Sequence, residues 1–429
     1  MKKNIILFSL LLITQIFAAQ KTYNHIAFIN ATAHLGNGKV IENSLIVINK
    51  DKIELVSSVK GIKLNHRAYD TVIDLSGKHI YPAIINPNNI LGLHDAEAVR
   101  ATRDFADVGN INPHIRSLIA YNTDNLIIPT IKTNGILYTQ CTPREGLISG
   151  SSSIMALEGW NWEDAVLKAD DGIHLNFPKN VTRKSDAEGE VSSSLNKKYT
   201  DELNYLIKFF NDAQSYCSSQ TVIEKNIRFE AMRPIFKGSA NLYIHVDKAK
   251  DILIALNFCT KQNIKKPVLV GAKESYKIIK EIKKSKIPIM LNRVHDLPDH
   301  NDDNVDISYT IPYLLQKDSI LFCLQLEGDM EAMQSRNLPF TAGTAVTYGL
   351  TKEQALQSIT LNTAKILGVD NKIGSIEEGK LSSLIVSDGD ILDMKTNNII
   401  MAYIAGKPVN LTNRQTELYL KYKTKYGIK

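Results

Sequence analysis

The sequence predicts an α/β protein, in which a (β/α)₈ barrel of the TIM type is joined to a small composite β-sandwich domain made from both chain ends. Two observations lead to this prediction. Between about residue 82 and residue 368, short apolar strand-like segments alternate with amphipathic helical segments, which is typical of parallel βα units. The flanking stretches are rich in strands and poor in helical periods, so the two ends are expected to pair with each other.

The composition supports a globular protein with a sizeable core. Of the 429 residues, 44% are hydrophobic and 22% are charged, which excludes a disordered chain. Four widely spaced cysteines exclude both a disulfide-dense scaffold and a cysteine-rich zinc module. Three of them stand in apolar segments, so buried thiols are expected, although one disulfide stays open as an alternative.

The first 19 residues have the pattern of a secretory signal peptide. Lys2 and Lys3 precede an apolar run over residues 5–17, and Ala18 and Ala19 follow. Cleavage after Ala19 would export the protein to the periplasm or the extracellular space, and an uncleaved anchor is the alternative. Loss of the two lysines lowers the formal charge from +6 to +4, which argues against a nucleic-acid partner. No later segment is long and apolar enough to span a membrane.

The predicted domain boundaries follow these changes in pattern. Residues 20–81 and 369–412 form the β-domain, residues 82–368 form the barrel, and residues 413–429 form a terminal helix. Hairpin-like turns are expected at residues 49–51 and at 76–77, and a polar surface loop at 178–199. One helix is expected over residues 351–367, with a capping box of Thr351 and Gln354 at its start and Gly368 at its end.

Several sequence segments, spread over the chain from residue 77 to residue 390, resemble the amidohydrolase superfamily, most closely its imidazolonepropionase-like members. They are GKHIYPAIINPNN (77–89), NGILYTQCTPREGLISGSSS (from 134), LYIHVDKAK (242–250), TAGTAVTYGLTKEQALQSITLNTAKILG (341–368) and GSIEEGKLSSLIVSDGD (374–390). The resemblance implies a barrel with its site at the C-terminal strand ends. It also implies zinc or another divalent metal that activates water for attack on a C–N bond.

The metal site is where the sequence departs from the family. Members have two histidines, one residue apart, after the first barrel strand; the corresponding positions here are Asn88 and Ile90. Neither side chain replaces imidazole as a zinc ligand. The family's preceding aspartate corresponds to Asn86, and no His-x-His occurs anywhere in the chain. We therefore predict a degraded metal site.

A few site residues remain as candidates. His245 stands at the family's fifth-strand metal-ligand position, and Asp247, two residues on, is a candidate for substrate binding. The sixth-strand histidine is missing from residues 271–274. Glu327 and Asp329 are the candidate catalytic carboxylates, in place of the family's eighth-strand general base.

An acidic segment over residues 293–306 follows the predicted seventh strand. It begins with Arg293 and His295, which are candidate substrate-binding residues at the functional end of the barrel. A hydrated acidic loop is favoured here over a cation site, because the spacing matches no EF-hand loop.

Two functions follow from these observations. The first is an exported hydrolase of non-peptide C–N bonds, weakly active or non-catalytic because most ligands are missing. The alternative is a ligand-binding pseudoenzyme, or a structural subunit that pairs with a metal-replete relative. The cofactor is zinc, another divalent metal or none. The expected partners are an unidentified small molecule and either a second copy of the chain or a related amidohydrolase.

Overall fold

The computed structural model describes residues 24–96, 99–185, 191–219, 224–299 and 302–428. The predicted signal peptide and His300 of the acidic segment therefore lie outside the described residues. Within the described ranges, none of the helices combines the length and the apolar character that a membrane crossing requires.

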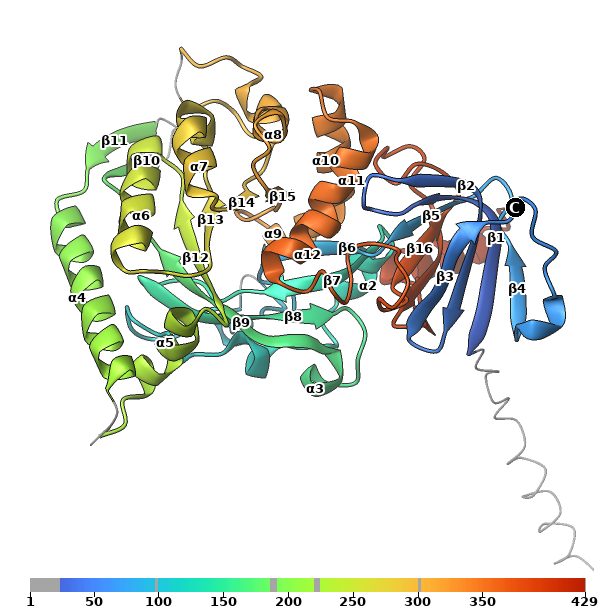
Figure 1. Cartoon of the computed structure of the whole chain (residues 1–429), viewed down its shortest axis with the longest axis horizontal. Helices are drawn as coiled ribbons and strands as arrows, with labels where there is room; N and C mark the ends of the chain where they lie inside the picture. Colours follow the sequence, from blue (N-terminus) through green and yellow to red (C-terminus); the bar gives the residue numbers. More distant parts are fainter. Residues whose placement is uncertain (1–23, 97–98, 186–190, 220–223, 300–301, 429) are drawn as a thin grey trace, which may run out of the picture.

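One eight-stranded sheet is built from both chain ends (Figure 1). Its strand order is β18-β17-β16-β5-β1-β2-β3, with β4 paired to β1, and β16 joins the two ends by antiparallel pairing with β5. The predicted division into a sandwich domain and a barrel domain stays a prediction. The strands are β1 (His25–His34), β2 (Val40–Asn49), β3 (Lys52–Ser58), β4 (Thr71–Asp74), β5 (His79–Pro82), β16 (Leu384–Ser387), β17 (Ile399–Ile404) and β18 (Lys407–Pro408).

Of the two turns expected in this sheet, one forms a hairpin and the other does not. The hairpin prediction at residues 49–51 is confirmed, because β2 and β3 pair antiparallel around Lys50, which has a left-handed φ of 53°. The strand pair expected around residues 76–77 is wrong. β4 and β5 both form there, but each lies parallel to β1 rather than against the other.

A second eight-stranded sheet forms the nearly closed barrel, in the order β15-β14-β13-β12-β9-β8-β7-β6. Its strands are β6 (Ile84–Asn89), β7 (Ile136–Cys141), β8 (Ile148–Ala156), β9 (Val166–Asn176), β12 (Asn241–Val246), β13 (Pro267–Gly271), β14 (Ile289–Leu291) and β15 (Phe322–Leu324). All neighbouring strands are parallel except β8, which is antiparallel to both β7 and β9. The connection from β7 to β8 is too short for a helical crossover, so a hairpin replaces one of the expected βα units.

Helices such as α6, α7 and α12 lie around the barrel sheet (Figure 1). The helices of the described residues are α2 (Ile128–Lys132), α3 (Trp162–Ala165), α4 (Tyr199–Ser218), α5 (Ile227–Lys237), α6 (Ala249–Lys261), α7 (Ile279–Ser285), α8 (Ile307–Lys317), α9 (Glu331–Gln334), α10 (Leu338–Thr347), α11 (Lys352–Ile359), α12 (Leu361–Leu367) and the terminal α13 (Arg414–Lys425). Short 3₁₀ helices lie at His66–Ala68, Arg100–Thr102, Ser117–Ala120, Ser275–Ile278 and Ser335–Asn337.

Two local predictions need correction. The segment 178–199 is not only a loop, because β10 (Val181–Ser185) and β11 (Val191–Leu195) form a two-stranded hairpin there. The helix expected over residues 351–367 is two helices, α11 and α12, separated at Thr360, whose φ and ψ of −131° and −93° are not helical. Its predicted ends are confirmed: Thr351 and Gln354 form the capping box, and Gly368 caps the end with a left-handed φ of 67°.

The core runs through the barrel and continues into the first sheet. Its largest cluster of buried side chains includes Tyr138, Phe210, Tyr243 and Phe322, and a separate cluster around Phe28 packs on the sheet of the chain ends. All four cysteines are unpaired; Cys141, Cys259 and Cys323 are buried, and Cys217 is half-buried. Burial raises the pKa of Cys141 to about 12, so this thiol is inert at neutral pH.

Candidate functional site

The barrel topology brings a polar cluster together at the C-terminal strand ends. Asn88 is on β6, His174 on β9 and His245 on β12, while Arg144 follows β7 and Glu327 follows β15. In a parallel barrel these strand ends face the same side, which is where such folds place their sites. We refer to these five residues as the mouth cluster.

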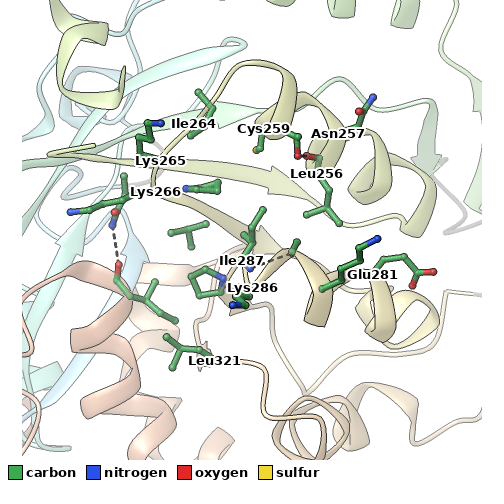
Figure 2. A pocket seen from close by; sticks show the side chains of 18 of the residues that line it. Leu256, Asn257, Cys259, Ile264, Lys265, Lys266, Glu281, Lys286, Ile287 and Leu321 are labelled. Atoms are coloured by element: carbon green, nitrogen blue, oxygen red, sulfur yellow. Dashed lines mark hydrogen bonds between the residues drawn. The ribbon is translucent and has the colours of Figure 1, made fainter. Parts of the chain in front are cut away.

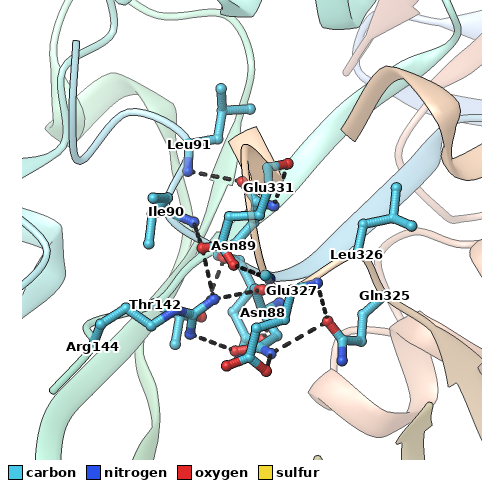
Figure 3. Close-up of polar contacts among 12 residues, drawn as sticks. Asn88, Asn89, Ile90, Leu91, Thr142, Arg144, Gln325, Leu326, Glu327 and Glu331 are labelled. Carbon is cyan, nitrogen blue, oxygen red and sulfur yellow. Dashed lines mark hydrogen bonds and ion pairs between the residues drawn. The ribbon is translucent and has the colours of Figure 1, made fainter. Parts of the chain in front are cut away.

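Asn88 is fully buried and contacts both Arg144 and Glu327 (Figure 3). Its φ of 49° is left-handed, a conformation that asparagine adopts more readily than most residues. The backbone N–H donates to Gln140 Oε1 (2.9 Å), and the side-chain amide donates to Glu327 Oε2 (2.8 Å). Asn88 is thus held by hydrogen bonds on both backbone and side chain.

Arg144 places a positive charge beside Asn88. Its Nη1 donates to Asn88 Oδ1 (2.8 Å), and its Nη2 donates to the Asn88 carbonyl and to Glu331 Oε1, both at 2.9 Å. Burial opposes the charge of Arg144, but the carboxylates of Glu331 and Glu327 outweigh it and raise the pKa of the guanidinium. The site therefore contains a permanent cation supplied by the chain itself.

Ile90 contributes only its backbone to this arrangement. Its N–H donates to Glu331 Oε1 (3.1 Å), and its side chain packs against the hydrophobic core. The second histidine position of the family is therefore an aliphatic contact here.

Both ring nitrogens of His245 have partners within the protein. Nδ1 lies 3.4 Å from Glu327 Oε2, and Nε2 lies 2.9 Å from His174 Nδ1. Because both nitrogens are engaged, no lone pair of His245 is free for a metal in this arrangement.

His174 is fully buried and stacks on Tyr243 with ring centroids 4.6 Å apart. Burial lowers its pKa well below the usual value, and electrostatic interactions with His245 and Arg144 lower it further. His174 Nδ1 and His245 Nε2 share one hydrogen bond, whose donor depends on the tautomers of the two rings; in the described part of the chain His174 Nε2 has no partner.

Glu327 is the anion of the cluster. Burial by itself raises the pKa of Glu327. The neighbouring charges of His245 and Arg144, with hydrogen bonds from His245 and Asn88, outweigh burial and hold the pKa well below its usual range. Glu327 is therefore ionised at neutral pH, and it accepts hydrogen bonds rather than donating them.

Asp247 has a carboxylate oxygen that is not used by the described residues. Oδ1 is buried without a hydrogen-bond partner, and burial raises the pKa of this carboxyl. Gly271 lies beside it with a φ of 89°, and a Cβ at that position would clash with Oδ1. The absence of a side chain at Gly271 is therefore what makes room for Asp247.

The other three predicted site residues make contacts outside the mouth cluster. Arg293 Nη2 donates to the carbonyls of Leu326 (3.3 Å) and Asp329 (2.6 Å), so it supports the loop that carries Glu327. Asp329 itself has an exposed side chain. His295 Nε2 lies 2.7 Å from Thr344 Oγ1, and burial lowers its pKa. Their predicted roles in catalysis and substrate binding stay predictions.

Two aspartates of the acidic segment are paired with lysines. Asp296 and Asp299 lie 2.5 and 2.8 Å from Lys273 Nζ, and Asp299 also contacts Lys248 Nζ (2.5 Å). Although burial opposes it, these lysines lower the pKa of Asp299. These two carboxylates are thus already engaged within the protein.

The residues of the mouth cluster do not fit a zinc site. Zinc takes about four nitrogen, sulfur or oxygen ligands at roughly 2.0–2.3 Å. Here Asn88 and Ile90 supply no imidazole, His245 has no free nitrogen, and the guanidinium of Arg144 would repel a metal ion. Among the described residues, no group of three or more His, Cys, Asp or Glu side chains is arranged to hold a metal.

Arg144 and His174 are the members of the cluster that sequence reasoning missed. The signals were present: Arg144 stands in CTPREG, directly after an apolar strand, and His174 stands in GIHLN, where a polar residue interrupts an apolar run. The ligand positions of the family, from which the other candidates were predicted, do not include these two residues.

Comparisons with known proteins show which families the chain is similar to. Residues 219–409 match the model of the amidohydrolase family. A segment of 41 residues is 49% identical to the imidazolonepropionase of Shewanella frigidimarina (strain NCIMB 400), and this match spans 10% of each chain.

Solved structures show the same fold over most of the chain. An amidohydrolase from Thermotoga maritima MSB8 covers 90% of this chain and 99% of its own, with 22% identity and a TM-score of 0.76. Molinate hydrolase covers 91% and 95% of the two chains, with 13% identity and a TM-score of 0.53. A Xaa-Pro dipeptidase covers 90% and 100%, with 13% identity and a TM-score of 0.53.

The nearly closed barrel, with a polar cluster at its C-terminal end, has the fold of the solved amidohydrolase structure. Residues 219–409 are similar to the amidohydrolase family, whose superfamily typically uses divalent metals as cofactors.

Proposed function

We propose that this chain is a non-catalytic or at most weakly active amidohydrolase that binds a small molecule at the mouth cluster. The observation that carries the proposal is the contact of Arg144 with Asn88 and Glu331. A fixed guanidinium occupies the space beside a metal-ligand position of the family, and it supplies positive charge without a coordination sphere that could activate water.

The atoms left without partners support an idea of what the ligand carries. Asp247 Oδ1 is a buried acceptor and His174 Nε2 is a buried ring nitrogen, and within the described ranges neither has a hydrogen-bond partner. Buried polar atoms are nearly always satisfied in folded proteins, so an atom that lacks a protein partner points to a ligand or water. We expect a ligand with N–H or O–H donors, such as an amine or amide.

A second candidate function is slow C–N bond hydrolysis without a metal. It is favoured by the chain of contacts from Glu327 through His245 to His174, in which an ionised carboxylate orients an imidazole. The weakness of this candidate is that His245 would have to release His174 before it could contact a substrate. Imidazolonepropionase-like chemistry and non-peptide C–N substrates belong to this candidate.

A hydrolysis panel separates the two functions. Amides, dipeptides and cyclic ureides are incubated with wild type, with Glu327→Gln and with His245→Ala, each with and without added zinc. We expect wild type to match both variants under both conditions. Turnover by wild type that both variants lose would instead establish the hydrolase, and its zinc dependence would decide between metal-dependent and metal-free chemistry.

A binding panel tests the ligand directly. Thermal-shift measurements with small amines, amides and carboxylic acids should give stabilisation by members of the first two classes, and Asp247→Asn should reduce it. Stabilisation by carboxylic acids alone would contradict the inferred donor chemistry.

We also propose that the chain is exported, with the mature protein in the periplasm or the extracellular space, and that it forms a homo-oligomer or pairs with a related amidohydrolase. The basis is the pattern of residues 1–19 and the loss of family ligands. Intact-mass analysis of the secreted protein should find Gln20 at the N-terminus, whereas retention of Met1 in a membrane fraction would contradict export. Light scattering gives the oligomeric state.

A further inference from the structure

A cavity lies at the other end of the barrel from the mouth cluster. It has a volume of about 790 Å³ and is bounded by α6, α7, the end of α12 and the residues that lead into β12, β13, β14 and β15 (Figure 2). Ligand pockets for drug-sized molecules commonly have volumes of about 300–1,000 Å³. We refer to this cavity as the basal groove.

The lining of the basal groove is strongly cationic. It contains five lysines and a single carboxylate, Glu281, for a net charge of +4. The ammonium group of Lys265 is hydrogen-bonded to Asn263 Oδ1 (2.8 Å), while those of the other four have neither a hydrogen bond nor an ion pair within the described residues. Figure 2 shows some of these lysines around the groove. The five lysines are Lys265, Lys266, Lys284, Lys286 and Lys365.

The interior of the groove is apolar. Ile264 and Ile287 form buried parts of its surface, and Leu253 and Leu321 are 40% and 36% exposed. Leucines exposed to this degree in a concave surface lose contact with water when an apolar group covers them, which favours binding. The groove therefore combines apolar contact area with a ring of unneutralised positive charges.

We propose that the basal groove binds a monomeric anionic amphiphile, a molecule with an acyl or aryl body and a carboxylate, phosphate or sulfate head. The apolar body would cover Leu253 and Leu321, and the head would be neutralised by the unpaired lysines. An apolar neutral ligand would leave the lysines repelling one another, and a cationic amphiphile would add to that repulsion. This binding function is separate from the one proposed for the mouth cluster.

Decanoate, decyl phosphate, decanol and decylammonium serve as probes in calorimetric titrations of the full-length mature protein. We expect decanoate and decyl phosphate to bind in about one equivalent per chain, and decanol and decylammonium to bind at least tenfold more weakly, a difference of about 1.4 kcal/mol. Equal affinity for decanol and decanoate would overturn the proposal, because it would show that the lysines play no part.

Charge reversal locates the site. Lys266→Glu/Lys286→Glu should weaken decanoate binding at least tenfold. Lys261→Glu/Lys280→Glu makes the same change in charge at two exposed lysines outside the lining of the groove, and it should leave binding unchanged. An equal loss in both double variants would mean that only the net charge of the protein matters and would overturn the proposal.

The apolar half of the proposal has its own test. Leu253→Ser/Leu321→Ser changes two exposed side chains, so folding should be retained, and circular dichroism checks this. Decanoate should bind more weakly to this variant while inorganic phosphate binding is unchanged. Binding of acetate or phosphate as strong as that of decanoate, or binding of anionic phosphatidylglycerol vesicles without binding of monomeric decanoate, would contradict a monomeric amphiphile site.

Discussion

Breaking the Arg144–Glu331 pair should strongly destabilise the folded protein. The two side chains are only 15% and 5% exposed, and their charged groups are 2.9 Å apart. Arg144→Met removes the cation and leaves the Glu331 carboxylate buried with backbone donors from Ile90 and Gly328. Removal of one partner from a buried ion pair typically costs about 3–5 kcal/mol, so this is the loss expected in the free energy of unfolding.

A double variant separates the charge from the packing. Arg144→Met/Glu331→Gln also removes the charge that Arg144→Met leaves on Glu331, so it should recover more than half of the loss, because the amide oxygen of the new side chain can still accept from the two backbone groups. The measurement is urea denaturation, followed by circular dichroism.

Arg116→Met provides the matched control. It breaks the Arg116–Asp170 pair, whose side chains are 45% and 40% exposed, and should cost no more than about 1 kcal/mol. Arg144→Met could instead lower the free energy of unfolding by less than about 1 kcal/mol, or the double variant could recover none of the loss. Either result would refute the view that the charge of Arg144 stabilises the mouth cluster.

Three further predictions test other parts of the account. His174 has a lowered pKa in the folded protein, so below about pH 6.5 the unfolded chain binds a proton that the folded chain excludes. The free energy of unfolding should therefore fall as the pH drops from about 6.5. Urea titrations at several pH values should show a shallower fall for His174→Gln than for wild type. The variant keeps the contributions of His79, His114 and His295, whose pKa values are also lowered, and an unchanged slope would contradict the neutral His174. Gly271→Ala should lower the free energy of unfolding by about 1–3 kcal/mol, because its Cβ would press on Asp247 Oδ1. The loss should be clearly larger than for Gly77→Ala, where the backbone has a similar positive φ but a Cβ would meet open space. Equal losses in the two variants would show that the contact with Asp247 is unimportant. Thr351→Ala removes the cap of α11 and should cost about 1 kcal/mol in the same assay, whereas Thr351→Ser should keep most of the stability.

The parts of the fold that depend on local chemistry could be predicted from the sequence. Thr351, Gln354 and Gly368 mark helix ends because their side chains, or the lack of one, satisfy particular backbone groups. The hairpin at residues 49–51 follows from alternating polarity on both sides of a turn. Such signals need only a few neighbouring residues.

Signals that depend on distant partners were missed or misread. β8 contains Ser149, Ser151, Ser152 and Ser153, so much of the strand lacks the apolar side chains that mark a strand in the sequence. The strand is nevertheless fully buried, because partners such as Asp171 accept hydrogen bonds from its hydroxyl groups, as Ser152 Oγ shows at 2.7 Å. The pairing of β4 and β5 with β1 could not be derived either, since local alternation does not say which strand is the partner.

The candidate site was only partly predictable for the same reason. Asn88, His245 and Glu327 were singled out by the resemblance to the amidohydrolase superfamily, and the structure brings these three together. Arg144 comes from a different strand end, and its role is defined by Glu331, which is 187 residues away in the sequence. A contact of this kind has no signature in local sequence.

The metal content of the purified mature protein tests the central claim most directly. Wild type and His245→Ala are incubated with zinc, freed of excess metal by gel filtration, and analysed by inductively coupled plasma mass spectrometry. The account predicts far less than one zinc per chain, with the same value in both proteins, because Arg144 supplies the charge of the site. About one zinc per wild-type chain that is lost in His245→Ala would contradict the account and restore a metal-dependent hydrolase.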